Sequence, residues 1–152
     1  MEIKRLRNEF SNLYNGDPWL DVTLKQTLQG ISAEKAAQRI ARDRNSIWEI
    51  LNHLIEWRRM LLKRMSGNII AVPEDNFIRE VPDTSEVSWR HTLAELEETQ
   101  QDWLSFLDGL QDEDLEKTYS GNGQSYYYLI QGTIQHDAYH LGQIVLLSKL
   151  EY

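Results

Sequence analysis

The sequence contains no cysteine. Disulfide bonds and a cysteine nucleophile are therefore excluded, and no thiolate can bind a metal ion. Any metal site in this chain has to use nitrogen and oxygen donors. Histidine is itself scarce, with four residues in a chain of 152. The positions of these few imidazoles are therefore informative.

Long apolar runs are also missing. One of the longest, residues 144–147, is far shorter than the roughly 20 residues that cross a bilayer. The first ten residues, MEIKRLRNEF, begin with basic side chains but lack the apolar segment of a secretory signal. We therefore expect a cytoplasmic protein that has no membrane-spanning segment.

Basic residues are outnumbered by acidic ones, 16 to 24, which gives a formal net charge of −8. Nucleic-acid binding needs a concentrated basic face that releases counterions. The densest basic stretch, WRRMLLKR at residues 57–64, lies in a helical pattern. We expect its charges to form one solvated face, and we expect no nucleic-acid partner.

The composition is that of an ordinary globular chain. Hydrophobic residues make up 41% and charged residues 26%, so disorder is not expected. The length suits one domain with a single core, and no internal repeat or low-complexity tract divides it. We expect residues 1–152 to form that one domain.

Apolar residues recur with a helical period almost throughout, and no segment shows the alternation of a strand. The segment 67–85, which contains Pro73 and Pro82, has no clear period and is predicted to be a long loop. Short helices are expected at 19–28 and from an N-cap at Ser32. Long helices are predicted at about residues 2–14, from an Asn45 or Ser46 cap to Gly67, at 86–107 and at 125–150. The pattern predicts an all-α four-helix bundle with a long crossover connection and short inserted helices.

Three of the four histidines lie on two of the predicted long helices. His136 and His140 are spaced i, i+4, so their Cβ atoms would lie roughly 5–6 Å apart on one helix face. His53 lies beside the apolar side of another helix. Three neutral imidazoles with a fourth position left open are typical of a catalytic metal site, whereas structural zinc sites close all four positions.

Each histidine also has a simpler interpretation. A single inward histidine is more often a hydrogen-bonded core residue than a ligand, and a HxxxH pair can arise by chance. Burying three polar rings without partners would cost about 1–3 kcal/mol for each unsatisfied group, and a shared metal ion removes that cost. His91 lies off the apolar stripe and is expected in solvent. Asp137, about 100° around the helix from His136, is not expected to bind the metal directly.

Two segments carry a resemblance to a known family. They are NSIWEI at 45–50 leading to His53 and Trp57, and HDAYHLGQI at 136–144; Pro18-Trp19 and Trp89 also match. The chain resembles the DinB-like (YfiT-type) superfamily of small bacterial four-helix-bundle metalloproteins. The resemblance covers nearly the whole chain. It implies that the ligands of a divalent ion, nickel or zinc above all, are His53, His136 and His140, that water fills the remaining positions, and that the chain forms a homodimer.

Other polar residues could support the ligands. A ligating histidine usually donates its second N–H to a carboxylate or carbonyl. Glu49 and Glu56, on either side of His53, could each accept that proton. Glu49 is favoured, although an outward salt bridge to an arginine is an equal alternative. Gln143 could orient His140 or a bound water, or it could bond elsewhere in the bundle. The tyrosines 126–128 could line a pocket, or they could pack in the core or at an interface.

The first functional hypothesis is a metal-dependent enzyme that acts on a small molecule. Relatives implied by the resemblance include S-transferases and isomerases that use low-molecular-weight bacterial thiols. Since the chain has no cysteine, the nucleophile would be an external thiol of the bacillithiol type or activated water, which gives a transferase or a hydrolase. The second hypothesis is a non-catalytic metal- or ligand-binding bundle linked to stress. The third is a structural bundle with water-bridged histidines.

Overall fold

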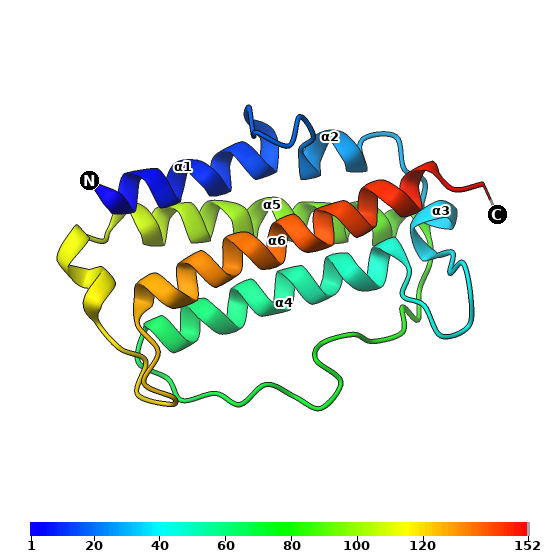
Figure 1. Cartoon of the computed structure of the whole chain (residues 1–152). Helices are drawn as coiled ribbons and strands as arrows, with labels where there is room; N and C mark the ends of the chain where they lie inside the picture. Colours follow the sequence, from blue (N-terminus) through cyan, green and yellow to red (C-terminus); the bar gives the residue numbers. More distant parts are fainter. Residues whose placement is uncertain (152) are drawn as a thin grey trace.

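A computed structural model describes residues 1–151, which form six α-helices, one short 3-10 helix and no β-strand. Four of the helices are long and lie side by side (Figure 1). They are α1 (Glu2–Asn15), α4 (Ile47–Met65), α5 (Glu86–Asp108) and α6 (Tyr126–Lys149). The predicted all-α four-helix bundle is confirmed.

The connection between α4 and α5 determines the direction of the helices. It runs back along the whole bundle, so α4 and α5 point the same way and α1 and α6 point the other way (Figure 1). A bundle with tight turns would alternate the direction of successive helices instead. The long crossover predicted at 67–85 is therefore present, and it passes along the side of α4.

Serine side chains fix where three of the long helices begin. Ser46, Ser85 and Ser125 each accept a hydrogen bond from the backbone N–H three residues later. At α4 the bond is reciprocal, because the Glu49 carboxylate accepts the N–H of Ser46 at 2.8 Å. Such a capping box satisfies two N–H groups that the helix itself leaves free. Of the two caps predicted for this helix, the structure selects Ser46.

The short elements differ from the sequence prediction. Helix α2 (Leu24–Leu28) begins only after Thr23, whose hydroxyl caps it, so residues 19–22 are not helical and Trp19 is 94% exposed. Helix α3 spans Ala33–Ala37, capped by Ser32 as predicted. The 3-10 helix η1 (Asp112–Glu116) was not predicted. Its first residue, Asp112, accepts the backbone N–H groups of Glu2 and Ile3, so η1 caps α1 at one end of the bundle. This contact joins residues far apart in the sequence and has no local pattern.

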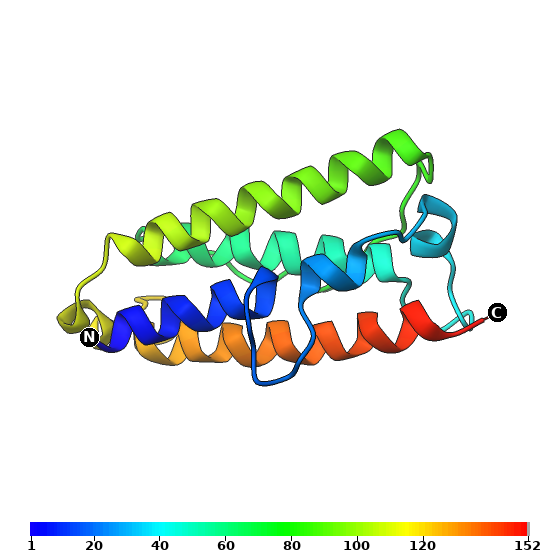
Figure 2. The same cartoon turned by 90° about the horizontal axis from the view of Figure 1, so that it is seen from above.

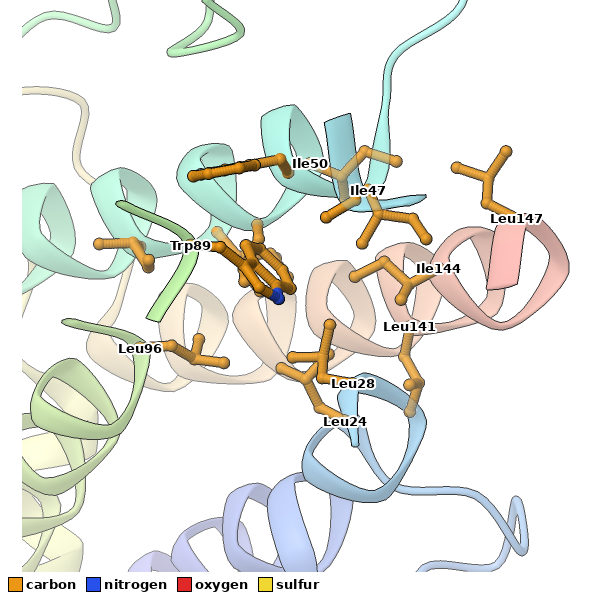
Figure 3. Packing of buried hydrophobic residues seen from close by; sticks show 14 of the residues in the cluster. Leu24, Leu28, Ile47, Ile50, Trp89, Leu96, Leu141, Ile144 and Leu147 are labelled. Atoms are coloured by element: carbon orange, nitrogen blue, oxygen red, sulfur yellow. The ribbon is translucent and has the colours of Figure 1, made fainter. Parts of the chain in front are cut away.

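Two clusters of buried side chains fill the space between the helices. Figure 2 shows the arrangement of the helices from above. The first centres on Trp48 and Trp89, whose rings lie 5.0 Å apart. Figure 3 shows Trp89 among aliphatic side chains of α2, α4 and α6. The second centres on Phe10 and Trp103, whose rings meet edge to face. Helices α1 and α4 each pack against both α5 and α6. No helix within residues 1–151 is long and apolar enough to span a membrane.

Candidate metal centre

Helices α4 and α6 bring three histidine side chains together. His53 comes from α4, and His136 and His140 come from successive turns of α6. One ring nitrogen from each lies within 4.8 Å of the others. The ring centroids are 4.5–4.9 Å apart, and no two rings stack in parallel. The rings therefore converge on one point, as the sequence analysis predicted.

The three rings differ in their access to solvent. His53 is 1% exposed and His140 is 8% exposed. The side chain of His136 is 28% exposed. Two rings are thus enclosed by the bundle, and the third closes the site toward solvent.

Hydrogen bonds fix the tautomer of two of the rings. The Nδ1 atom of His53 lies 2.6 Å from the carbonyl oxygen of Asn76, which can only accept, so Nδ1 carries the proton. The Nδ1 atom of His140 lies 2.6 Å from Oε1 of Gln143, and the amide nitrogen of Gln143 faces the hydroxyl of Tyr139 at 3.2 Å. Both histidines therefore present the lone pair of Nε2.

The lone pair of His53 points at His136. The two Nε2 atoms lie 2.9 Å apart. Because Nε2 of His53 is an acceptor, a hydrogen bond between them requires the proton to be on Nε2 of His136 when no cation is present. A divalent cation among the rings would replace that proton, and its ligands would be neutral imidazole nitrogens, the donors that zinc and nickel accept. The residues present therefore fit the ion that the sequence implied.

Burial keeps the enclosed rings uncharged. Desolvation lowers the pKa of His53, and the neighbouring His136 lowers it further. Desolvation and His136 together lower the pKa of His140 to about 4. Both rings are therefore neutral at pH 7, the form that binds a metal ion.

Asn76, in the long crossover, was missed by the sequence analysis. Its carbonyl orients His53, and its side-chain oxygen accepts the indole N–H of Trp57 at 2.9 Å. Asn76 and Phe77 both have positive φ, at 50° and 60°. A left-handed conformation is rare for residues other than glycine, and asparagine adopts it most readily. Apart from this preference, the sequence carried no sign that the loop would return to α4 at this point.

We expect Asn76→Pro to weaken divalent-metal binding by about 10- to 100-fold, the usual effect of losing the partner that orients a ligand. Proline fixes φ near −65° and so moves the carbonyl away from His53. Asn76→Gly is the matched control, since it keeps both the positive φ and the carbonyl. Competition titration with a chromophoric chelator measures both variants, and equal affinities would contradict the role of the carbonyl.

Glu49 does not support His53. Its carboxylate pairs with the guanidinium of Arg39 and caps Ser46, and it is 2% exposed. The preferred prediction for Glu49 is therefore wrong, because the capping box turns this side chain toward the helix start. The alternative is correct in pairing Glu49 with an arginine, but the carboxylate is buried and does not point outward. Glu56 pairs with Arg59 instead. Gln143 lies where the sequence analysis placed it, against His140.

We expect Glu49→Ala to reduce the free energy of unfolding by about 1–3 kcal/mol, because the Ser46 N–H and Arg39 both lose their acceptor. The same variant should bind metal as tightly as the wild type. Urea unfolding and chelator competition measure the two quantities on one sample. A weakened metal site in a folded variant would restore the link between Glu49 and His53.

The basic stretch at 57–64 does not form one solvated face. Arg58 and Arg64 are 6% and 9% exposed. Arg58 forms an ion pair with Asp137 and donates to Gln100, and Arg64 donates to the carbonyl of Ile70 at 2.9 Å. The local pattern failed here because the partners of these arginines lie on other helices and in the crossover.

Asp137 lies beside the site without entering the histidine cluster. Burial alone would raise its pKa, but the Arg58 guanidinium keeps that pKa below its ordinary value. One carboxylate oxygen lies 3.9 Å from Nδ1 of His136, beyond hydrogen-bond distance. The carboxylate therefore remains ionised and provides negative charge next to the third ring. His91, by contrast, has a side chain 75% exposed, as predicted.

A groove of about 220 Å³ opens beside His136. Tyr128 lines it, whereas Tyr126 donates its hydroxyl to the carbonyl of Met65 and Tyr127 is 42% exposed. Of the three tyrosines considered from the sequence, only Tyr128 lines this groove. A larger hollow of about 610 Å³ lies between α1, α2 and α5, but none of the three histidines lines it. The volume of a hollow alone therefore does not identify the candidate metal site.

Comparison with known proteins identifies the family of the chain. The model of the DinB superfamily matches residues 22–144. The chain belongs to the DinB superfamily. The region matched to the DinB superfamily contains all three converging histidines and the crossover that orients His53. A search of curated proteins and a search of solved structures found no match for the chain.

Proposed function

We propose that this chain is a divalent-metal-dependent enzyme whose ion, nickel or zinc, is held by His53, His136 and His140. The observation that carries the proposal is the pair of fixed tautomers. Two buried rings turn the lone pairs of Nε2 into the site because Asn76 and Gln143 occupy their Nδ1 protons. Neutral imidazoles whose Nδ1 protons are already hydrogen-bonded, and whose Nε2 lone pairs converge, are the arrangement expected of metal ligands.

Access through one side favours catalysis over a structural role. Structural zinc sites enclose the ion with four protein ligands, whereas catalytic sites use three and leave a position open. Within residues 1–151 the group of possible ligands comprises three histidines and no carboxylate. His136 lines a groove on the surface, so a small molecule can reach the edge of the site.

A bound divalent ion supplies Lewis acidity, which lowers the pKa of a coordinated water or thiol and polarises a carbonyl group. The residues of the chain orient and enclose the site. Asn76 and Gln143 fix two rings, and Asp137 places a carboxylate near the third. Because the chain has no cysteine, a transferred thiol has to come from a low-molecular-weight cosubstrate. The reaction proposed is S-transfer to a small electrophile, or hydrolysis.

The test uses protein purified without a histidine tag. Elemental analysis before and after dialysis against nickel or zinc salts measures the metal content. Conjugation of a small electrophile with a thiol, and its hydrolysis without one, are then followed for the wild type and His136→Ala. We expect one metal ion per chain and turnover that the substitution abolishes.

Three outcomes would contradict this proposal. Stoichiometric metal without turnover in either assay would favour a non-catalytic metal-binding bundle. Metal that dialysis cannot restore would favour a structural bundle with hydrogen-bonded histidines. Equal rates for the wild type and His136→Ala would rule out the catalytic role of the site.

A further inference from the structure

The groove beside His136 carries no charged side chain. It is lined by aromatic, aliphatic and small residues of α4 and α6, and His136 is its one ionisable imidazole. The lining residues besides His136 and Tyr128 are Trp57, Leu61, Leu129, Gly132 and Thr133. Asp137, whose carboxylate lies 3.9 Å from Nδ1 of His136, pairs with Arg58 and does not line the groove. A ligand in the groove therefore meets apolar surface, two aromatic rings and the edge of the histidine cluster.

We infer that this groove binds an uncharged, mainly aromatic or aliphatic part of the substrate and places it against His136. The inference rests on the proposed function, because it assigns the substrate class of the same site. An apolar cavity of about 150 Å³ holds a benzene molecule. The groove, at about 220 Å³, therefore suits a single aromatic ring or two fused rings. A carboxylate or phosphate would lose its hydration there without gaining an ionic partner from the side chains that line the groove.

Gly132 supports the assignment. It lies within α6, where glycine destabilises a helix relative to alanine. Its φ is not positive, and a Cβ atom there would meet no atom within 4 Å, so neither backbone conformation nor close packing requires glycine. The missing side chain leaves space in the groove, one helical turn before His136. Gly142 on the same helix also faces open space but does not line the groove.

The larger hollow between α1, α2 and α5 does not offer such an assignment. Its charged residues, Lys25 and Glu97, already pair with each other at 3.0 Å, and Glu97 also accepts the hydroxyl proton of Tyr14. Nothing there indicates a ligand of defined chemistry. The groove beside His136 is the hollow in which lining, size and neighbouring chemistry agree.

The test is an NMR titration of the full chain, with and without zinc, using indole as a neutral probe and indole-3-carboxylate as its charged counterpart. Indole should shift the indole N–H signal of Trp57 and the amide signals of residues 128–136. In the zinc-free chain, indole-3-carboxylate should bind at least about 10-fold more weakly than indole. Gly132→Leu fills the groove and should raise the Kd for indole at least about 10-fold. Gly142→Leu, the matched glycine outside the groove, should bind indole like the wild type.

The outcomes separate this inference from the proposed function, because zinc content is measured on the same samples. Indole binding in a chain that takes up no zinc would support the groove and end the metal-dependent proposal. Zinc uptake with no indole binding, or with binding that survives Gly132→Leu, would overturn the groove. Equal binding of the charged probe to the zinc-free chain would overturn it too. Binding that appears only on dilution would assign the groove to a second copy of the chain, and would also overturn it.

Discussion

Replacing His140 with alanine should weaken the binding of nickel or zinc by more than about 100-fold, above the range for losing a partner that only orients a ligand. The substitution removes one of three converging nitrogens and also releases Gln143. Two imidazoles, those of His53 and His136, then remain, one fewer than the three that converge in the wild type. Chelator competition on protein without a histidine tag measures the change.

The matched control for this prediction is His91→Ala. His91 is the remaining histidine, and its side chain is 75% exposed and lies outside the cluster. It should bind metal like the wild type. If His140→Ala also binds metal like the wild type, the ion is not held by the three converging rings, and the proposed function loses its basis.

Arg58→Met should reduce the free energy of unfolding by about 3–5 kcal/mol, because it leaves a buried carboxylate without its cation. Arg58 and Asp137 are both less than 10% exposed, and Arg58 also satisfies Gln100. At roughly 2–4 °C per kcal/mol for a chain of this size, the melting temperature should fall by about 6–20 °C. Urea unfolding of the metal-free protein measures the loss.

The loss should depend on pH. In the wild type, Arg58 holds the pKa of Asp137 below its ordinary value, so the pair contributes stability above that value and loses it as pH falls through the folded pKa. In the variant, burial raises the pKa of Asp137, so protonation at pH 5 relieves part of the penalty. The difference between the two proteins should therefore be larger at pH 8 than at pH 5.

The double variant Arg58→Met/Asp137→Leu separates the ion pair from simple packing. Removing both charges takes away the unpaired carboxylate, so most of the lost stability should return. If the double variant is as unstable as the sum of the two single variants, the pair has no specific coupling. Arg58 would then act through the packing of its side-chain stem alone.

Periodicity and capping residues predicted the long helices well because both signals are local. The spacing of His136 and His140 placed two imidazoles on the same face of α6, one turn apart. That placement needs no knowledge of other elements. Ser46 marked the start of α4 for the same reason. The same local reasoning failed for Glu49, whose helix cap turned it away from His53 toward Arg39.

The amino-acid sequence alone determined the all-α class, the directions of the histidines on their own helices, and the exclusion of a cysteine nucleophile or ligand. The tertiary structure alone decided which nitrogen of His53 carries the proton, through the carbonyl of Asn76 in the crossover. It also decided that Arg58 is buried against Asp137 rather than solvated, and that α6 leaves an uncharged groove at His136. The physical reason is the distance along the sequence over which each interaction acts. Helix periodicity and capping act within a few residues, whereas tautomers, ion pairs and grooves depend on groups far apart in the chain that meet only after folding.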